Sequence, residues 1–188
     1  TAHHCDDQAE TILLQLFRGA GIQGLAAMSL CRSTPQGWHA RPCLTWSRQA
    51  LQAYAVQHNL TWIEDPSNQN IDFDRNYVRQ HIMPVIQNRW PAASRSMARS
   101  AGHLAATLPI VQAQTDYDLE HSLNLAGRLL VSSLLTLPLV RCQHVVRAWV
   151  RRLGHPVPNQ AQLREITDKV LNAAVDAQPM VGWEQTLL

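Results

Sequence analysis

Apolar residues in the first part of the chain recur at the spacing of an amphipathic helix. They lie three or four positions apart between residues 9 and 17, which predicts a helix with one buried face: Ala9, Ile12, Leu13, Leu16 and Phe17. Gly19 is expected to end this helix, because glycine adopts the left-handed conformation of a C-terminal cap without strain. Residues 1–3 are predicted to be the end of a strand, and residues 19–43 a loop region punctuated by glycine and proline.

The pattern then alternates between helix and strand. A second helix is predicted after Ser47, whose hydroxyl group can cap it. Its expected inner face consists of Leu51, Tyr54 and Ala55. Residues 60–64 predict a short strand, and a third helix is expected to start near Asp74 and to be interrupted at Pro84. This alternation predicts an α/β layer structure for residues 1–92.

The strand pattern disappears after Pro91, and the remaining residues are predicted to be helical. A long helix, kinked at Pro109, is expected through Met97, Ala101, Leu104, Leu108 and Val111. A compact unit of three helices should follow, at residues 127–135, 138–153 and 159–174. We therefore predict a linking helix at 93–125 and a small all-α domain at 126–188.

Composition narrows the class of protein only modestly. The hydrophobic fraction of 46% suits a folded core, and no segment approaches the apolar run that crosses a bilayer, so no membrane association is expected. The four cysteines form no C-x-x-C pair, which predicts free thiols in a reducing, cytoplasmic compartment. Of 16 basic residues only Lys169 is a lysine. Arginine binds phosphate through two parallel hydrogen bonds, so this bias suits nucleic acid, although a GC-rich coding sequence produces it too.

The most chemically loaded segment is HHCDDQAET at residues 3–11. It begins almost at the first residue, and we expect the chain to start within a domain. The segment lies at a predicted strand-to-helix turn, where open α/β sheets bind ligands, and carboxylates there can hold Mg²⁺ or a cationic substrate. A structural alternative is a capping box formed by Asp7 and Glu10. That alternative leaves His3, His4 and Asp6 unexplained, so we favour a functional site.

Two further clusters lie at 18–24 and 65–79. Residues 19–24 match G-x-G-x-x-G, but the match follows a helix and not a strand, which excludes a dinucleotide fingerprint. A helix cap or a loop shaped around a substrate remains. Arg75 and Arg79 are four residues apart, so they share one helix face that suits phosphate binding, or they are surface residues of a helix capped by Asp74.

The predicted helix at 138–155 carries a stripe of basic side chains. These fall within an arc of about 120° and include no acid: Arg141, His144, Arg147, Arg151 and His155. The opposite side is largely apolar. An all-basic stripe is typical of contact with an RNA backbone. The alternative is a solvated helix face, although such a face usually mixes charges of both signs.

Taken together, these segments resemble the tRNA(Ile)-lysidine synthetases. The resemblance is carried by HHCDDQAETILLQLFRGAGIQGLAAM, RPCL and EDPSNQNIDFDRNYVRQHIMP, and more weakly by residues 176–183. It implies the C-terminal half of an open parallel-sheet ATP-pyrophosphatase domain, followed by a helical tRNA-binding domain. These enzymes use ATP and Mg²⁺ to adenylate the C2 carbonyl of the wobble cytidine in a tRNA(Ile) with a CAU anticodon. Free L-lysine then displaces AMP to give lysidine.

The resemblance also implies roles for individual residues. It implies that His3 and Glu10 are catalytic residues, and that Asp6 contacts Mg²⁺ or the nucleotide. Asp7 and Glu10 are expected to face the ammonium group of lysine, and Arg18 and Arg75 to contact phosphate or the activated cytidine. The nucleotide loop of the family, S-G-G-x-D-S, does not occur in this sequence, so the chain alone is expected to be inactive. Cys5 stands where the family is expected to have a small aliphatic residue and Cys43 where it is expected to have a leucine, a mild departure.

Three alternatives to this assignment remain. A metal-dependent hydrolase could use His3, His4, Asp6 and Asp7, although adjacent histidines of a strand point to opposite faces. A sulfur-inserting tRNA enzyme would be expected to have C-x-x-C pairs. A tRNA-binding protein without catalysis would need only the basic helix. Half of a parallel sheet also exposes an unpaired edge, which a homodimer would cover.

Overall fold

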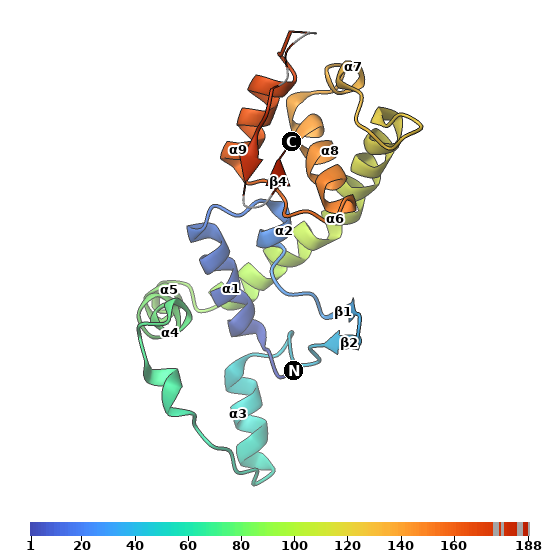
Figure 1. Ribbon diagram of the computed structural model, residues 1–188. Coiled ribbons are helices and arrows are strands. Elements are labelled where there is room, and N and C mark those ends of the chain that lie inside the picture. Colours follow the sequence, from blue (N-terminus) through green and yellow to red (C-terminus); the bar gives the residue numbers. More distant parts are fainter. Residues whose placement is uncertain (175–176, 178, 184–185, 188) are drawn as a thin grey trace. The chain divides into compact units, whose positions relative to one another are not determined.

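The computed structural model describes residues 1–174, 177, 179–183 and 186–187. The chain divides into two compact units, residues 1–108 (unit 1) and 109–188 (unit 2). The division falls inside α6 (Ala93–Ser122), the longest described helix (Figure 1). It lies next to Pro109, which lacks the N–H group of a regular helical hydrogen bond. No helix of the described residues has the length and apolar character to cross a membrane.

The first helix of unit 1, α1, spans Cys5–Phe17 and begins with a capping box. The imidazole of His4 accepts a hydrogen bond from the Asp7 amide at 3.3 Å, and the Asp7 carboxylate accepts one from the His4 amide at 2.9 Å. The box lies one helical turn earlier than the alternative box of Asp7 with Glu10, so capping accounts for His4 and Asp7. Gly19, with φ of 67°, follows the last turn, which confirms the predicted end of the helix.

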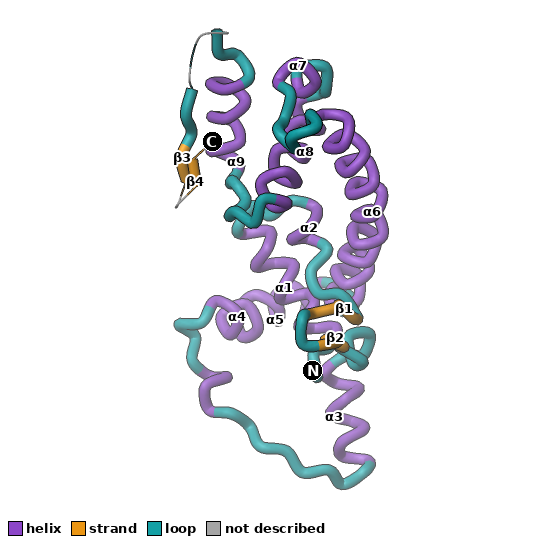
Figure 2. The backbone as a smooth tube through the Cα atoms, turned by 45° about the vertical axis from the view of Figure 1, so that its right-hand side comes forward, coloured by secondary structure: helices purple, strands orange, loops and turns teal. Residues whose placement is uncertain are grey.

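The described strands form two short antiparallel pairs. In unit 1, α2 (Ile22–Leu25) leads to β1 (Cys31–Thr34), which pairs with β2 (Gly37–Ala40) in a region predicted to be loop (Figure 2). The predicted strand at 60–64 is wrong, since these residues adopt no regular structure and Ile63 is 96% exposed. Residues 1–3 form no strand either. An isolated strand leaves its backbone groups unpaired, and the described residues offer these segments no partner strand. The parallel sheet implied by the resemblance is absent from the part of the chain that the structure describes.

The remaining elements of unit 1 are helical. Ser47 caps α3 (Arg48–Gln57) by accepting a hydrogen bond from the Ala50 amide at 3.1 Å, as predicted. Tyr54 was expected on the inner face of α3 but is 58% exposed. A 3₁₀ turn, η1 (Pro66–Gln69), precedes one helical segment made of α4 (Asp74–Tyr77), the π turn η2 (Val78–Ile82) and α5 (Met83–Arg89). The interruption predicted at Pro84 is confirmed, and it takes the form of this π turn. The core of the unit is Ala9, Leu13, Val78 and Met83.

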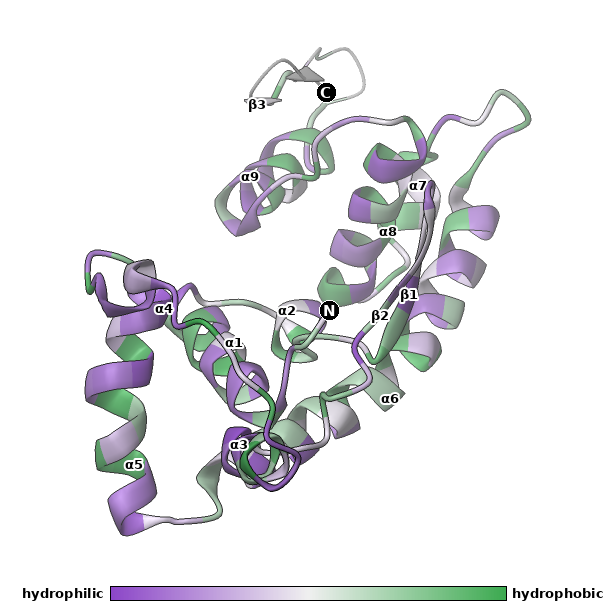
Figure 3. Ribbon diagram, turned by 90° about the horizontal axis from the view of Figure 1, so that it is seen from below, coloured by the Kyte–Doolittle hydropathy of each residue, from purple (hydrophilic) through white to green (hydrophobic). Residues whose placement is uncertain are grey.

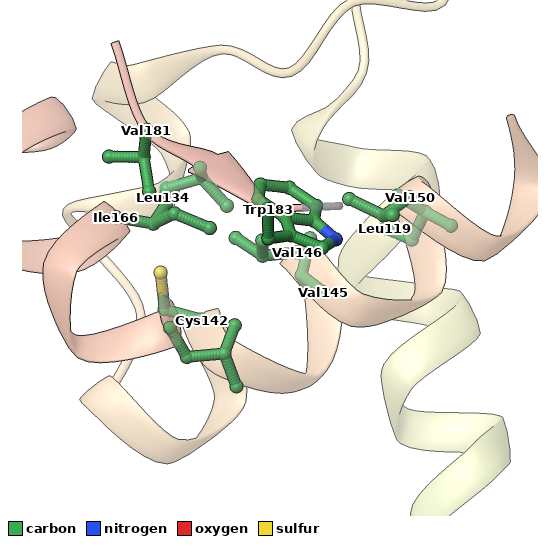
Figure 4. Close-up of a cluster of buried hydrophobic side chains, with 10 residues drawn as sticks. Leu119, Leu134, Cys142, Val145, Val146, Val150, Ile166, Val181 and Trp183 are labelled. Atoms are coloured by element: carbon green, nitrogen blue, oxygen red, sulfur yellow. The ribbon is translucent and has the colours of Figure 1, made fainter. Parts of the chain in front are cut away.

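Unit 2 surrounds a second hydrophobic core. Besides the end of α6 it contains α7 (Val131–Leu134), α8 (Leu139–Arg152), α9 (Gln160–Glu165) and the π turn η3 (Ile166–Val170). A hairpin of β3 (Gly182–Trp183) and β4 (Thr186–Leu187) follows, so the unit is mainly helical and the prediction of an all-α domain is not confirmed. Val181 and Trp183 are buried with residues of α8, which gives the hairpin an apolar support that its own few hydrogen bonds do not supply (Figure 4). Asp176 and Gln178, part of the weaker resemblance, lie outside the described residues.

Candidate functional site

The centre of the motif-rich part of unit 1 is a buried carboxylate held by two arginines. Glu10 is 2% exposed. Arg79 donates from Nε to its Oε1 atom at 2.7 Å and from Nη2 to Oε2 at 2.9 Å. Arg75 donates from Nε to Oε2 at 2.9 Å. The two arginines are four positions apart, so both reach α1 from one face of the α4–η2 segment. Hydrogen bonding to Glu10 is the largest influence on Arg79 and raises the pKa of its guanidinium group.

Asp7 completes this network, which we call the Glu10 cluster (Asp7, Glu10, Arg75 and Arg79). The Oδ1 atom of Asp7 lies 3.0 Å from Nη2 of Arg79 and 3.1 Å from Nη2 of Arg75, while Oδ2 serves the capping box. Two carboxylates and two guanidinium groups neutralise each other in a partly buried setting. The sequence singled out Asp7 and Glu10 in one cluster and Arg75 and Arg79 in another, without relating the two. It expected Arg75 to contact phosphate or the activated cytidine, whereas its guanidinium group contacts carboxylates of its own chain.

Beside the cluster lies a cavity of about 770 Å³, which we call the α1–α3 pocket. Asp6 and Glu10 of α1, Arg48 of α3, Gln87 of α5 and Arg95 of α6 are among its lining residues. Asp6 accepts a hydrogen bond from the Arg48 amide at 2.8 Å, which ties α1 to the first residue of α3. Gln87 donates to Asp6 at 3.5 Å. Asp6 is therefore the carboxylate outside the Glu10 cluster that lies in the pocket wall.

The other predicted site residues occupy different positions. His3 does not line the α1–α3 pocket, and its Nδ1 atom lies 3.0 Å from the Thr1 hydroxyl group. Burial is the main influence on His3 and lowers its pKa. Arg18, at the C-terminal end of α1, is largely exposed and lies 3.9 Å from Asp74. Within the described ranges, no three His, Cys, Asp or Glu side chains gather as a set of metal ligands.

Trp46, Arg48 and Arg95 line the pocket but were not predicted from the sequence. His4, which belongs to the HHCDDQAET segment, lines the same pocket and caps α1. Ser47 was predicted to cap a helix. Its position gave a weak indication that its neighbours, Trp46 and Arg48, could belong to a site. Nothing in the sequence related Arg95, at the start of a different helix, to the HHCDDQAET segment.

In unit 2 the basic stripe is partly neutralised by α6. Arg141 donates to the Asp118 carboxylate, from Nε at 2.8 Å, and the Asp118 side chain is almost completely buried. α8 itself contributes no acid to the stripe. The acid, Asp118, comes from α6, and the spacing of residues along one helix cannot reveal such a partner. His144 and Arg147 are half-buried, whereas Arg151 and His155 are exposed. Figure 3 shows hydrophilic and hydrophobic positions alternating along α8.

The Asp118–Arg141 pair predicts a specific dependence of stability on pH. Hydrogen bonds from Arg141, and secondarily from Gln114, lower the pKa of Asp118 below its usual value. The stabilisation is therefore present above the unfolded-state pKa of about 3.9 and is lost as pH falls through the lower folded-state value. We expect Asp118→Asn to lower the melting temperature at pH 7 by several degrees, and the difference from the unsubstituted protein to shrink toward pH 3.

Thermal unfolding followed by circular dichroism at both pH values measures this effect. Asp116→Asn is the matched control, since Asp116 lies on the same helix, is exposed and accepts a single hydrogen bond, from Gln112 at 2.8 Å. An Asp118→Asn effect of equal size at both pH values would contradict the assigned role of the carboxylate charge.

Comparison with known proteins assigns the N-terminal and C-terminal parts of the chain to two different domain families. Residues 1–86 match the family model of the PP-loop domain, and residues 129–188 match that of the TilS substrate binding domain. The chain thus joins a PP-loop part to a substrate-binding domain of one class of tRNA-modifying enzymes. Its relatives are tRNA(Ile)-lysidine synthases.

The relatives share substantial identity along almost the whole chain. The tRNA(Ile)-lysidine synthase of Legionella pneumophila (strain Lens) is 39% identical over 183 residues, which cover 97% of this chain and 42% of the relative. That of Alkalilimnicola ehrlichii is 40% identical over 185 residues, or 98% of this chain and 41% of the relative. That of Coxiella burnetii is 39% identical, and the match covers 40% of its length. The chain therefore spans less than half the length of these curated relatives.

Proposed function

We propose that this chain supplies part of the active site and a tRNA-binding surface of an ATP-dependent ligase. The ligase joins free L-lysine to C2 of the wobble cytidine in a tRNA(Ile) with a CAU anticodon. The observation that carries the proposal is the Glu10 cluster beside the α1–α3 pocket, in a chain that joins the two family domains. The cluster is assembled from the two segments that carry the resemblance, HHCDDQAET and DRNYVR.

The proposed chemistry has two steps. The C2 carbonyl oxygen of cytidine attacks the α-phosphorus atom of ATP, forming a P–O bond while pyrophosphate leaves. An amine of lysine then forms a bond to C2, the C2–O bond breaks, and AMP departs with the oxygen. A ring carbonyl is a poor electrophile, and adenylation turns its oxygen into part of a good leaving group. Cationic side chains assist by stabilising the negative charge that moves onto pyrophosphate.

The residues of this chain are suited to positioning and to charge balance. Asp6 is the acid of HHCDDQAET that lines the pocket outside the Glu10 cluster, so it is our candidate for holding a cation. Mg²⁺, which typically uses one or two carboxylates together with substrate phosphates, would neutralise charge on the departing pyrophosphate. Asp7 and Glu10 can receive the lysine ammonium group only if it exchanges with a guanidinium group of Arg75 or Arg79. We therefore assign these two acids primarily to positioning the arginines.

Unit 2 is proposed to hold the tRNA backbone. The exposed Arg151 and the half-buried His144 and Arg147 of α8 are the candidates for phosphate contact. Burial lowers the pKa of Arg147, with a smaller effect from the charge of Arg151, yet Arg147 stays cationic at neutral pH. Arg141 is assigned to holding α8 against Asp118. A tRNA-binding role without catalysis for the chain on its own is the second candidate, supported by these α8 residues.

The test is transfer of radiolabelled lysine to a tRNA(Ile) transcript by the full-length protein in the presence of ATP and Mg²⁺. We expect ATP-dependent incorporation, and we expect Asp6→Asn to lower its rate by about 100-fold, since the variant removes a charge at the reacting centre. The melting temperature is measured in parallel, because Asp6 also supports the first turn of α3.

Asp74→Asn is the matched control for this experiment. Asp74 lies in the DRNYVR segment, but its side chain is 77% exposed and its contact with Arg18 is long at 3.9 Å. We expect this variant to retain full activity. Absence of lysine transfer by the unsubstituted protein would refute the proposed ligase, whereas full activity of a stable Asp6→Asn variant would refute only the role of Asp6.

A further inference from the structure

The wall of the α1–α3 pocket contains two arginines that the proposed reaction does not use. Arg48 is the first residue of α3, and Arg95 lies in the first turn of α6. Both side chains line the pocket and are exposed. Among the described residues, neither forms an ion pair within 4.0 Å, in contrast to Arg79 in the same wall. Two guanidinium groups from separate helices thus lie at one cavity without an acidic partner.

The charges around the pocket leave it electropositive on this side. Arg75 and Arg79 compensate Asp7 and Glu10, so the Glu10 cluster is close to neutral. Asp6 is the remaining acid of the wall, and it accepts hydrogen bonds from the backbone of α3 and from Gln87. The wall therefore contains, outside the Glu10 cluster, one carboxylate and two guanidinium groups that form no ion pair within 4.0 Å among the described residues. The first turns of α3 and α6 add to this, because helix N-termini carry partial positive charge.

Trp46 supplies an apolar surface in the same wall. Its side chain is 58% exposed although it lines the pocket, which is unusual for the largest apolar side chain. Its carbonyl oxygen accepts a hydrogen bond from the Cys5 amide at 2.8 Å, so its backbone is fixed to the start of α1. Trp46 and Arg48 are two residues apart across the cap of α3. The Trp46 ring therefore belongs to a residue that is close in sequence to Arg48, whose guanidinium group forms no ion pair in the part of the chain that the structure describes.

We propose that Trp46, Arg48 and Arg95 bind an unpaired stretch of RNA, with one base stacked on Trp46 and the flanking phosphates on the two arginines. The combination of an exposed aromatic ring with arginines is the chemistry by which single-stranded RNA is recognised, because every base has a π face and every linkage a charge. A cavity of about 770 Å³ accommodates a nucleotide-sized group beside the ring. The proposal rests on the proposed function, in that the RNA strand is the one that presents the modified nucleotide.

The two arginines and Trp46 are expected to contribute to RNA binding in different ways. Phosphate contacts release counterions, so they control how strongly binding depends on salt. Stacking on Trp46 involves no net charge and contributes affinity at any salt concentration. Free ATP would be a different occupant of the same cationic wall. Because ATP carries no neighbouring nucleotides, it would be affected by the arginines without requiring an unpaired RNA strand.

The experiment measures fluorescence anisotropy of a labelled RNA hairpin with an unpaired loop against the protein, over a series of salt concentrations. We expect Arg48→Gln and Arg95→Gln each to weaken binding about fivefold at low salt, and to reduce the slope of log affinity against log salt by about 0.7. Trp46→Ala should weaken binding about tenfold and leave the slope unchanged. Arg99→Gln, one turn further along α6 and exposed, and Trp38→Ala, 75% exposed on the hairpin, are matched controls expected to have no effect.

The outcomes separate this inference from the proposed function. If the unsubstituted protein binds the hairpin and all three pocket variants bind it like the controls, the inference is overturned while tRNA binding stands. If the unsubstituted protein does not bind RNA, the inference and the tRNA-binding part of the proposed function both fail. A parallel titration with labelled ATP distinguishes the occupants. Variants that lose ATP affinity but keep RNA affinity would assign the wall to the nucleotide and contradict the inference.

Discussion

Glu10→Gln is expected to lower the free energy of unfolding by about 3–5 kcal/mol, the range found when one partner of a buried ion pair is removed. The carboxylate is 2% exposed and accepts three hydrogen bonds from two guanidinium groups. Glutamine keeps the shape but removes the charge, and its NH₂ group faces Arg75 and Arg79, which also carry only donors. Asp7 alone then has to compensate two cations.

Urea unfolding of the variant and the unsubstituted protein measures this difference. Glu165→Gln is the control, because Glu165 pairs with Lys169 at the surface, where such a pair contributes only about 0–1 kcal/mol. A loss below about 1 kcal/mol for Glu10→Gln would show that the Glu10 cluster contributes as little as a surface pair.

A double-mutant cycle tests the connection between Glu10 and Arg79 directly. Arg79→Gln removes the guanidinium group that contacts both oxygens of Glu10, and the double variant removes both charges. If the pair acts as a unit, the double variant is destabilised by less than the sum of the single variants, with a coupling of about 0.5–3 kcal/mol. Additive losses would indicate that each residue acts through other partners.

The sequence predicted the helices of unit 1 well wherever local chemistry determines them. Gly19 ends α1 and Ser47 caps α3, because both roles depend on the residue and its immediate neighbours. The strand predicted at residues 60–64 does not form, because a strand depends on residues far away in the sequence. Alternating apolar residues favour a strand only when another strand pairs with them, and no such pairing occurs among the described residues.

The sequence singled out Asp6 and the residues of the Glu10 cluster, but neither their pairing nor the other residues of the pocket wall. The polar density of HHCDDQAET singled out Asp6, Asp7 and Glu10, and helical spacing grouped Arg75 with Arg79. That these five residues divide into a neutral cluster and a separate acid depends on contacts across more than 60 positions of the chain. Helical spacing likewise predicted the basic residues of α8. It could not show that Asp118 of α6 pairs with Arg141 and reduces the positive charge of this stripe.

Trp183→Ala is expected to destabilise unit 2 by about 3–5 kcal/mol, because removing a buried aromatic side chain leaves a cavity that the surroundings fill only partly. Trp183 is 5% exposed and lies among Leu119, Val146 and Val150, and its indole N–H donates to the Pro156 carbonyl at 2.8 Å. The hairpin of β3 and β4 is too short to persist without this anchor.

Trp183→Phe separates packing from hydrogen bonding in the same core. Phenylalanine retains most of the apolar contact but cannot donate to the Pro156 carbonyl, so we expect a loss of about 1 kcal/mol plus a smaller packing defect. Trp38→Ala, in an exposed position on the hairpin of β1 and β2, should change stability by less than about 0.5 kcal/mol. Denaturant unfolding of the three variants gives the order directly. Equal losses for Trp183→Ala and Trp183→Phe would place the stabilisation in the indole hydrogen bond, and a loss for Trp183→Ala no larger than that for Trp38→Ala would mean that the hairpin does not support the core.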